Sequence, residues 1–357
     1  MAARLKIREI ASLTGVSVST VSRVLAGKAN TSTEVRQKVL ACARQQGVLE
    51  GLSSSPSLFH QLTVFAPARA FDVRTDIFYY KVIQGLREAV RQQDVRISYC
   101  SLEEEHNDVA AFLQRIGDPA CEAAVLIGID DPLIHEVAAD VGKPCVLINC
   151  ADRKMRLDSV SPNHQQIGEF SANVLIEHGH RDIMVLMCLR RVTMERRLTG
   201  IREAFAHHHI AFDQSQRLLA TSGFGASEAH EAILTAFAQQ PRDALPSAIL
   251  VGGDFLATGA HAALRELGLN VPGDISLLSM DGFNPGEFHD VPLAAVHVPR
   301  DELGEEALRL LQLRINKPGQ PLRDVLLSGR LALRDSLKRV GSRKQTAAVS
   351  TRSNSLY

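Results

Sequence analysis

The chain has no tryptophan, few aromatic residues and no long apolar run. Its 357 residues include 4 tyrosines and 13 phenylalanines, and aromatic residues make up 5% of the total. No stretch of about eighteen apolar residues occurs, which excludes a transmembrane helix. The first residues are polar and lack the apolar core of a signal peptide, so nothing in them directs export. At this length we expect a globular, soluble protein of two or three domains.

The sequence also lacks the motifs of enzymes and metal proteins. Its 6 cysteines are scattered without CxxC spacing, and we expect free thiols in a reducing cytosol. No P-loop, HExxH or Ser-His-Asp order is present, and the glycines of residues 222–227 lack GxGxxG spacing. We therefore expect no metal, no cofactor and no catalytic activity.

The formal net charge is zero, but the charges are unevenly placed. Residues 1–51 hold 8 basic and 3 acidic residues, and residues 338–357 hold 5 basic residues and no acid. The rest of the chain holds 27 basic and 37 acidic residues. A basic head on an acidic body fits a head that binds a polyanion such as nucleic acid.

Residues 5–27 read as two short helices joined by a tight turn. The apolar stripe of the first helix would consist of Ile7, Ile10, Ala11 and Leu13. Gly15 can take the left-handed conformation that a sharp turn needs, and Ser17 stands where the N-cap of the second helix belongs.

The second helix has an apolar side and a small, polar side. Val21, Val24 and Leu25 would face inward, and the outer side would carry Val18, Ser19, Ser22 and Arg23. Such a face, with one long cation, can lie in a major groove of DNA. An ordinary helical hairpin with a solvated face is the alternative.

The run GVSVSTVSRVLAG closely resembles the helix-turn-helix of the lac/galactose repressor (LacI/GalR) family of transcriptional regulators. The match continues through Asn30-Thr31-Ser32 into residues 34–39, the start of a third helix expected over residues 32–46. The resemblance implies a DNA-binding domain over residues 1–47. It places Val18, Ser19 and Arg23 at base-reading positions. Phosphate contacts or helix caps fall to Ser17, Thr20, Ser22, Thr31, Lys6 and Arg36.

Residues 48–61 are rich in Gly, Ser and Pro and read as a linker. Relatives carry there a Tyr-x-Pro-Asn motif and a hinge helix with an Ala-Arg pair and a leucine that enters the minor groove. Here Ser54-Ser55 replace the Ala-Arg pair, Pro56 falls inside the expected helix and Leu58 is one residue out of register. The sequence therefore predicts a degenerate hinge. Residues 341–357 show no periodicity and read as a disordered tail.

From residue 62 onward, short apolar runs alternate with amphipathic helices. Strands are expected at 62–67, 95–101, 123–129, 144–150, 182–188, 217–221, 247–252 and 275–280. Helices are expected at 78–93, 106–116, 132–140, 164–178, 194–207, 226–239 and 256–267. Apolar strands joined by helices predict two doubly wound parallel sheets, each covered on both faces, with ligands at the carboxyl ends of the strands.

This body also resembles the LacI/GalR family, in blocks at 179–186, 197–205, 268–281 and 298–311. In relatives it is a two-lobed, periplasmic-binding-protein-like domain that binds an effector and dimerises, and its chain crosses between lobes three times. We place the crossings near residues 160, 290 and 323. The domain would then span residues 62–340. One lobe would comprise 62–160 and 291–323, and the other 161–290 and 324–340.

Five residues match effector-binding positions of the family. They are Phe78, Tyr79, Asn149, Arg197 and Asp281. A carboxylate can accept sugar hydroxyls, a guanidinium can grip a hydroxyl, carboxylate or phosphate, and an aromatic face suits a sugar ring. Each has a structural alternative: a surface turn for Asp281, a helix salt bridge for Arg197 and a plain core position for Phe78. Relatives often have Asn-Asp where this chain has Gly253-Asp254, so the ligand need not be a simple hexose.

The resemblance implies a bacterial, cytoplasmic, nucleoid-associated repressor that acts as a homodimer. It would bind near-palindromic operator DNA, with its affinity switched by a small sugar or sugar derivative, and it would not bind membranes. Two other functions stay open: a sugar-binding module whose head no longer binds DNA, supported by the altered linker, and an α/β enzyme acting on a sugar.

Overall fold

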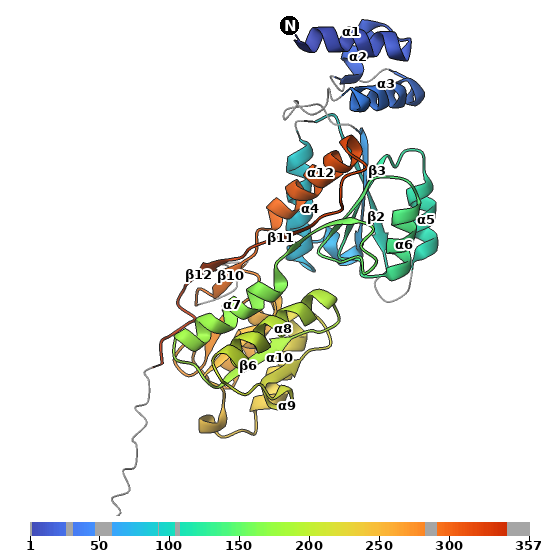
Figure 1. Ribbon diagram of the computed structural model, residues 1–357. Coiled ribbons are helices and arrows are strands. Elements are labelled where there is room, and N and C mark those ends of the chain that lie inside the picture. The colour runs from blue at the N-terminus through green and yellow to red at the C-terminus, as the bar shows by residue number, and fades with distance from the viewer. Residues whose placement is uncertain are drawn as a thin grey trace, which may run out of the picture.

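A computed structural model describes residues 2–25, 31–46, 59–91, 93–103, 108–282 and 291–340 (Figure 1). Most of the predicted linker and the whole predicted tail lie outside these described residues, so their predicted conformations stay predictions. No helix in the described part of the chain is long and apolar enough to cross a membrane.

Three short helices form the N-terminal head. They are α1 (Ala2–Thr14), α2 (Val18–Leu25) and α3 (Thr33–Gln45). Their small core includes Ile10, Val21, Val39 and Ala43, all fully buried. The predicted two-helix turn and third helix are therefore confirmed.

One inward position of α1 was predicted wrongly. Leu13 is 59% exposed, whereas Thr14 is 3% exposed and its hydroxyl donates to the Ile10 carbonyl at 2.6 Å. Residue 14 lies two turns after Ile7 and about one turn after Ile10, so its side chain faces the core with theirs. Residue 13 lies to one side of that face. The hydrogen bond satisfies the threonine hydroxyl inside the core.

The first lobe is a six-stranded parallel sheet in the order β11-β5-β4-β3-β1-β2. Its strands are β1 (Gln61–Pro67), β2 (Arg96–Leu102), β3 (Ala123–Ile127), β4 (Cys145–Ile148), β5 (Asp158–Pro162) and β11 (Asp324–Leu327). One face packs against α4 (Ile77–Val90) and α12 (Arg300–Asn316), the other against α5 (Val109–Gly117) and α6 (Pro132–Asp140). A single 3-10 turn, η2 (Ala68–Phe71), follows β1.

The second lobe has the sheet order β12-β10-β9-β8-β6-β7. Its strands are β6 (Ile183–Met187), β7 (Leu218–Ala220), β8 (Ala248–Val251), β9 (Ser276–Ser279), β10 (Ala294–His297) and β12 (Arg330–Ala332), of which only β12 is antiparallel to its neighbour. Helices α7 (His164–Glu177) and α8 (Val192–His207) cover one face, and α10 (Ala226–Phe237) and α11 (Asp254–Glu266) the other. Short turns α9 (Gln214–Arg217) and η3 (Arg242–Ala244) complete it. The predicted pair of parallel-sheet lobes is confirmed.

The chain crosses between the lobes between β5 and α7, between β10 and α12, and between β11 and β12 (Figure 1). The first crossing agrees with the prediction near residue 160. The other two lie later than predicted, because β10 pairs in the second sheet and β11 in the first. Each strand has only three apolar residues in a run, which fits either sheet equally well, so sequence alone cannot assign it.

Close contacts between helices depend on glycine. A Cβ built on Gly200 of α8 would lie 1.8 Å from the Gln165 carbonyl oxygen of α7, and one on Gly168 would lie 2.1 Å from the Arg197 carbonyl oxygen. The two backbones therefore approach as closely as they do only because these side chains are absent. This packing fixes the start of α8, from which several cleft residues project.

We expect Gly200→Ala to destabilise the second lobe by about 1–3 kcal/mol, because the added methyl group must push one backbone away from the other. Thermal unfolding followed by circular dichroism measures the effect. Gly117→Ala is the matched control, since a Cβ there meets nothing within 4 Å. Equal melting temperatures for both variants would contradict the packing argument.

Candidate functional site

The outer face of α2 is exposed as the sequence predicts. Val18, Ser19, Ser22 and Arg23 all lie on the surface, and Val18 is 45% exposed. Ser17 caps the helix, because the Thr20 amide donates to its hydroxyl at 3.1 Å. The Thr20 hydroxyl also lies 2.8 Å from that of Ser17, so in this state it supports the cap.

The cations of the head have different surroundings. The Arg23 guanidinium folds back on its own helix, where Nε donates to the Ser19 carbonyl at 3.3 Å. Arg36, expected to meet phosphate, lies 3.6 Å from the Glu122 carboxylate of the first lobe. The Thr31 hydroxyl is buried and has no partner among the described residues. The side chain of Lys6 lies outside the described part of the structure.

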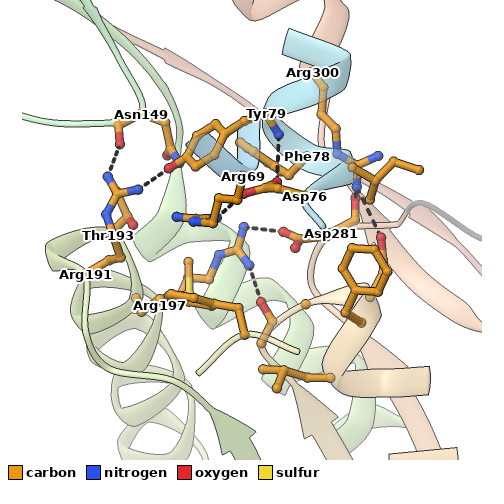
Figure 2. A pocket seen from close by; sticks show the side chains of 18 of the residues that line it. Arg69, Asp76, Phe78, Tyr79, Asn149, Arg191, Thr193, Arg197, Asp281 and Arg300 are labelled. Carbon is orange, nitrogen blue, oxygen red and sulfur yellow. Dashed lines mark hydrogen bonds and ion pairs between the residues drawn. The ribbon is translucent and has the colours of Figure 1, made fainter. Parts of the chain in front are cut away.

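A cavity of about 90 Å³ lies between the lobes. Phe78, Tyr79, Asn149, Arg197 and Asp281 all line it, so the structure brings the five predicted residues together (Figure 2). They lie just after parallel strands or near the N-termini of the helices that follow. The carboxyl ends of these strands and the N-termini of these helices lie at the same edge of a parallel sheet. The cavity is smaller than the roughly 300–1,000 Å³ of typical ligand sites, so its walls must part to admit a ligand.

Hydrogen bonds connect the predicted residues through one that was not predicted, His164. Arg197 Nε donates to His164 Nδ1 at 3.0 Å, and His164 Nε2 lies 2.6 Å from Asn149 Oδ1. Because Nδ1 accepts, Nε2 must carry the proton and donate. Asn149 Nδ2 then donates to the Tyr79 hydroxyl at 2.9 Å. The chain of bonds thus runs from the second lobe into the first.

Arg191, at the start of α8, crosses the cleft in the same direction. Its Nε donates to Asp130 at 2.6 Å. Its Nη2 donates to the Asn149 carbonyl at 2.7 Å and its Nη1 to the Tyr79 hydroxyl (Figure 2). Burial alone would lower the pKa of Arg191, but the Tyr79 oxygen and the Asp130 carboxylate raise it above its usual value. A second-lobe cation is therefore held by three first-lobe oxygens.

Arg197 itself is fully buried and serves the second lobe. Nη2 donates to Asp281 Oδ1 at 2.8 Å and Nη1 to the Gly252 carbonyl at 2.8 Å. Arg197 therefore forms a salt bridge, but with Asp281 beyond the end of β9 and not, as the structural alternative had it, within its own helix. The Asp281 side chain remains 17% exposed, so the pair still borders the cavity.

The absence of a side chain at Gly253 leaves room beside Asp281. A Cβ built there would lie 2.9 Å from Asp281 Oδ2, with no other atom closer. The backbone of Gly253 is extended, with φ −176°, so the position does not require glycine. Glycine at this position therefore leaves Asp281 Oδ2 uncrowded by a neighbouring side chain.

Several lining residues escaped the sequence analysis, notably Arg69, His164, Arg191, Thr193 and Arg300. Thr193 could have been found, because it precedes Arg197 by one helical turn and so shares its face. Arg69 lies in the 3-10 turn η2 that follows β1. In the described residues no group of three or more His, Cys, Asp or Glu could hold a metal ion.

Comparison with known proteins agrees with this arrangement. Residues 6–47 match the model of bacterial regulatory proteins of the lacI family, and residues 172–337 match a periplasmic binding protein-like domain. The chain belongs to the LacI family. This family consists of transcriptional regulators and not of enzymes, which removes the sugar-enzyme alternative.

Its relatives match over nearly their whole length. The chain is 24% identical to the ribose operon repressor of Haemophilus influenzae and 24% identical to the HTH-type transcriptional repressor PurR of Histophilus somni, covering 93% of this chain and 98% of each relative. This LacI-family member is thus a DNA-binding repressor with an effector-binding domain. Among solved structures, CelR is in complex with cellobiose, and a LacI family regulator of Enterococcus faecium has ribose bound.

Solved structures share the fold. The complex of the transcriptional regulator CelR with cellobiose aligns with a TM-score of 0.68 at 21% identity, covering 92% of this chain and 99% of that one. The lac repressor dimer bound to operator and the anti-inducer ONPF aligns with a TM-score of 0.68 at 19% identity, covering 92% and 97%. At sequence identities of 21% and 19%, these two alignments show a shared fold and nothing more.

The buried position of His164 makes the stability of the fold depend on pH. Burial lowers the pKa of His164 well below 6.5, and the nearby Arg197, Arg191 and Arg196 lower it further. As the pH falls, the unfolded chain therefore takes up the proton first. Stability should be full above about pH 7 and should fall below about pH 6.5 by up to about 1.4 kcal/mol per pH unit. Urea denaturation at several pH values measures this slope.

His164→Gln should flatten the slope, because the amide keeps the hydrogen-bonding pattern without the titration. Part of the slope should remain, since burial also lowers the pKa of His180. His207→Gln, at an exposed position, should leave the slope as in the wild type. A wild-type slope in His164→Gln would rule out His164 as its source.

Proposed function

We propose that this LacI-family member is a homodimeric repressor of the bacterial cytoplasm. It binds a near-palindromic operator through the exposed face of α2. A small carbohydrate-like effector bound between the lobes sets its operator affinity. One head offers few base contacts, and a two-fold protein pairs naturally with two half-sites.

The observation that carries this proposal is that the cavity wall comes from both lobes. Tyr79 and Asn149 belong to the first lobe, and Arg197 and Asp281 to the second. A ligand that touches both sets must favour one closure angle over another. It can change DNA affinity only through such a difference in binding between the two arrangements.

The expected coupling is about 1–3 kcal/mol, or roughly 5–150-fold in operator affinity. We expect the lower end of this range. The linker sequence lacks the hinge features of relatives, and a less ordered linker passes lobe motion to the heads less efficiently.

Selection of genomic DNA fragments by the purified protein tests the proposal. The fragments retained should share a near-palindromic site, and retention should change with ribose, cellobiose or a purine base added. Retention of sequences with no common site, or full affinity of a monomer for an isolated half-site, would contradict it.

Arg23 should be the main base-reading cation of the head. If it swings out from Ser19 to a guanine, Arg23→Ala should cost about 1–3 kcal/mol of binding and relax one operator position. Lys6→Ala, Arg36→Ala and Lys38→Ala should instead weaken all sequences alike and flatten the salt dependence. Operator titration against a panel of single-base variants separates the two effects. Equal, sequence-independent losses in all four variants would show that another face reads DNA.

Asp281→Asn should abolish the response to the effector, because it removes the carboxylate charge beside the cavity while an amide oxygen can still accept from Arg197. The measurement is the ratio of operator Kd with and without the panel compound that acts most strongly on the wild type. This ratio should fall to about 1 from the wild-type range of about 5–150. Asp72→Asn, whose carboxylate pairs with exposed Arg74 outside the cavity, is the control. An unchanged ratio in Asp281→Asn would remove Asp281 from the effector site.

A further inference from the structure

We propose that the effector is an anion. Its carboxylate or phosphate group would bind at the N-terminus of α8, between the Thr193 hydroxyl and the Arg69 guanidinium. This inference rests on the proposed use of the inter-lobe cavity as the effector site.

Thr193 gives the first observation. Its side chain lines the cavity and is 4% exposed, yet its hydroxyl has no hydrogen-bond partner among the described residues. A buried hydroxyl without a partner costs free energy that a ligand oxygen can recover. The position of Thr193, one turn before Arg197, directs both side chains to the same cavity (Figure 2).

The N-terminus of α8 gives the second observation. Its N-cap residue, Arg191, makes no side-chain cap, and the amides of Met194 and Glu195 both donate to the Arg191 carbonyl. The amides of Val192 and Thr193 belong to the first two residues of this 16-residue helix, where the backbone has no preceding turn to donate to. Such amides and the positive end of the helix dipole favour a negatively charged oxygen.

The third observation is that three of the four Phe and Tyr residues lining the cavity lie beside a guanidinium group. The Arg69 guanidinium lies 5.2 Å from the Tyr79 ring centroid and 5.5 Å from that of Phe224, and so joins a ring of the first lobe to one of the second. Arg300 lies 5.5 Å from the Phe78 ring centroid. A neutral sugar or a purine would stack on open ring faces, whereas these rings present guanidinium groups to the cavity.

Each of the four arginines that line the cavity is paired with an aspartate. The pairs are Arg69–Asp76, Arg191–Asp130, Arg197–Asp281 and Arg300–Asp254. The charges of the wall therefore balance, and an anion at Thr193 would share the Arg69 guanidinium with Asp76. A guanidinium can do so because it carries five N–H donors, and it binds carboxylate and phosphate with good geometry.

The test compares matched neutral and anionic probes on the full chain. D-glucose, D-glucuronate and inorganic phosphate are titrated at constant ionic strength, with the melting temperature and calorimetric binding as readouts. We expect a saturable response to glucuronate, to phosphate or to both, and a weaker one or none to glucose. Glucuronate without phosphate identifies a carboxylate as the group bound, and the reverse identifies a phosphate.

Two variants place the response in the cavity. Thr193→Val keeps the shape and removes a hydroxyl that has no partner in the described part of the chain, so the fold should be retained. Arg69→Gln removes one guanidinium. Each should weaken anion binding by about tenfold, the loss expected for one charge-assisted hydrogen bond. Arg74→Gln removes a neighbouring cation that is 85% exposed and does not line the cavity, and it should leave anion binding unchanged.

Three results would overturn the proposal: glucose bound as tightly as glucuronate, no saturable response to either anion, or anion binding that both cavity variants retain. The last result would place the anion on the basic head. Operator titration with the same probes separates this inference from the proposed function. Anion binding without any change in operator affinity leaves the anion site standing and defeats the switch. A change in operator affinity caused by a neutral sugar alone would support the switch and defeat the anion site.

Discussion

The neutral imidazole of His164 is the link on which the closed cleft depends. It accepts from Arg197 and donates to Asn149, so a single ring joins the buried cation of the second lobe to the polar cluster of the first. His164 is also the first residue of α7, directly after the chain leaves β5 for the other sheet. A buried polar network stabilises only when every member is satisfied. The crossing between β5 and α7 and the hydrogen bonds of His164 therefore favour the same arrangement of the two lobes.

In this arrangement several hydrogen bonds across the cleft must break together when the lobes separate. If the lobes part, Arg191 loses Asp130, the Asn149 carbonyl and the Tyr79 hydroxyl together, and water must replace all three. Under the proposed function, a ligand in the cavity would act by adding to or replacing bonds that span the cleft. A second arrangement with its own set of hydrogen bonds would provide the bistable element that the proposed switch requires.

The sequence predicted most elements because local signals agreed with the fold. The helix expected at 132–140 matches α6 in both bounds, since Asp131 accepts from the Leu133 and Ile134 amides and Pro132 opens the first turn. Sheet membership of β10 and β11 was not predictable, because strand pairing across a crossing depends on contacts far apart in sequence. The five cleft residues followed from family positions. Arg69 and Arg191 did not, because their roles arise from rings and carboxylates that only the folded chain brings near.

Asn149 shows how one residue at the end of a strand sets the polarity of the whole site. Its backbone is left-handed, with φ 56°, a conformation that asparagine tolerates better than most residues. Its amide both accepts from His164 and donates to Tyr79, which an ionised aspartate could not do. Because Asn149 and Arg191 both donate to the Tyr79 oxygen, the hydroxyl hydrogen of Tyr79 must point to another acceptor. The Tyr79 hydroxyl, the Thr193 hydroxyl and the guanidinium groups make this part of the cavity wall rich in donors. A wall of this kind complements a ligand that brings acceptors, and negatively charged oxygens are the strongest acceptors available.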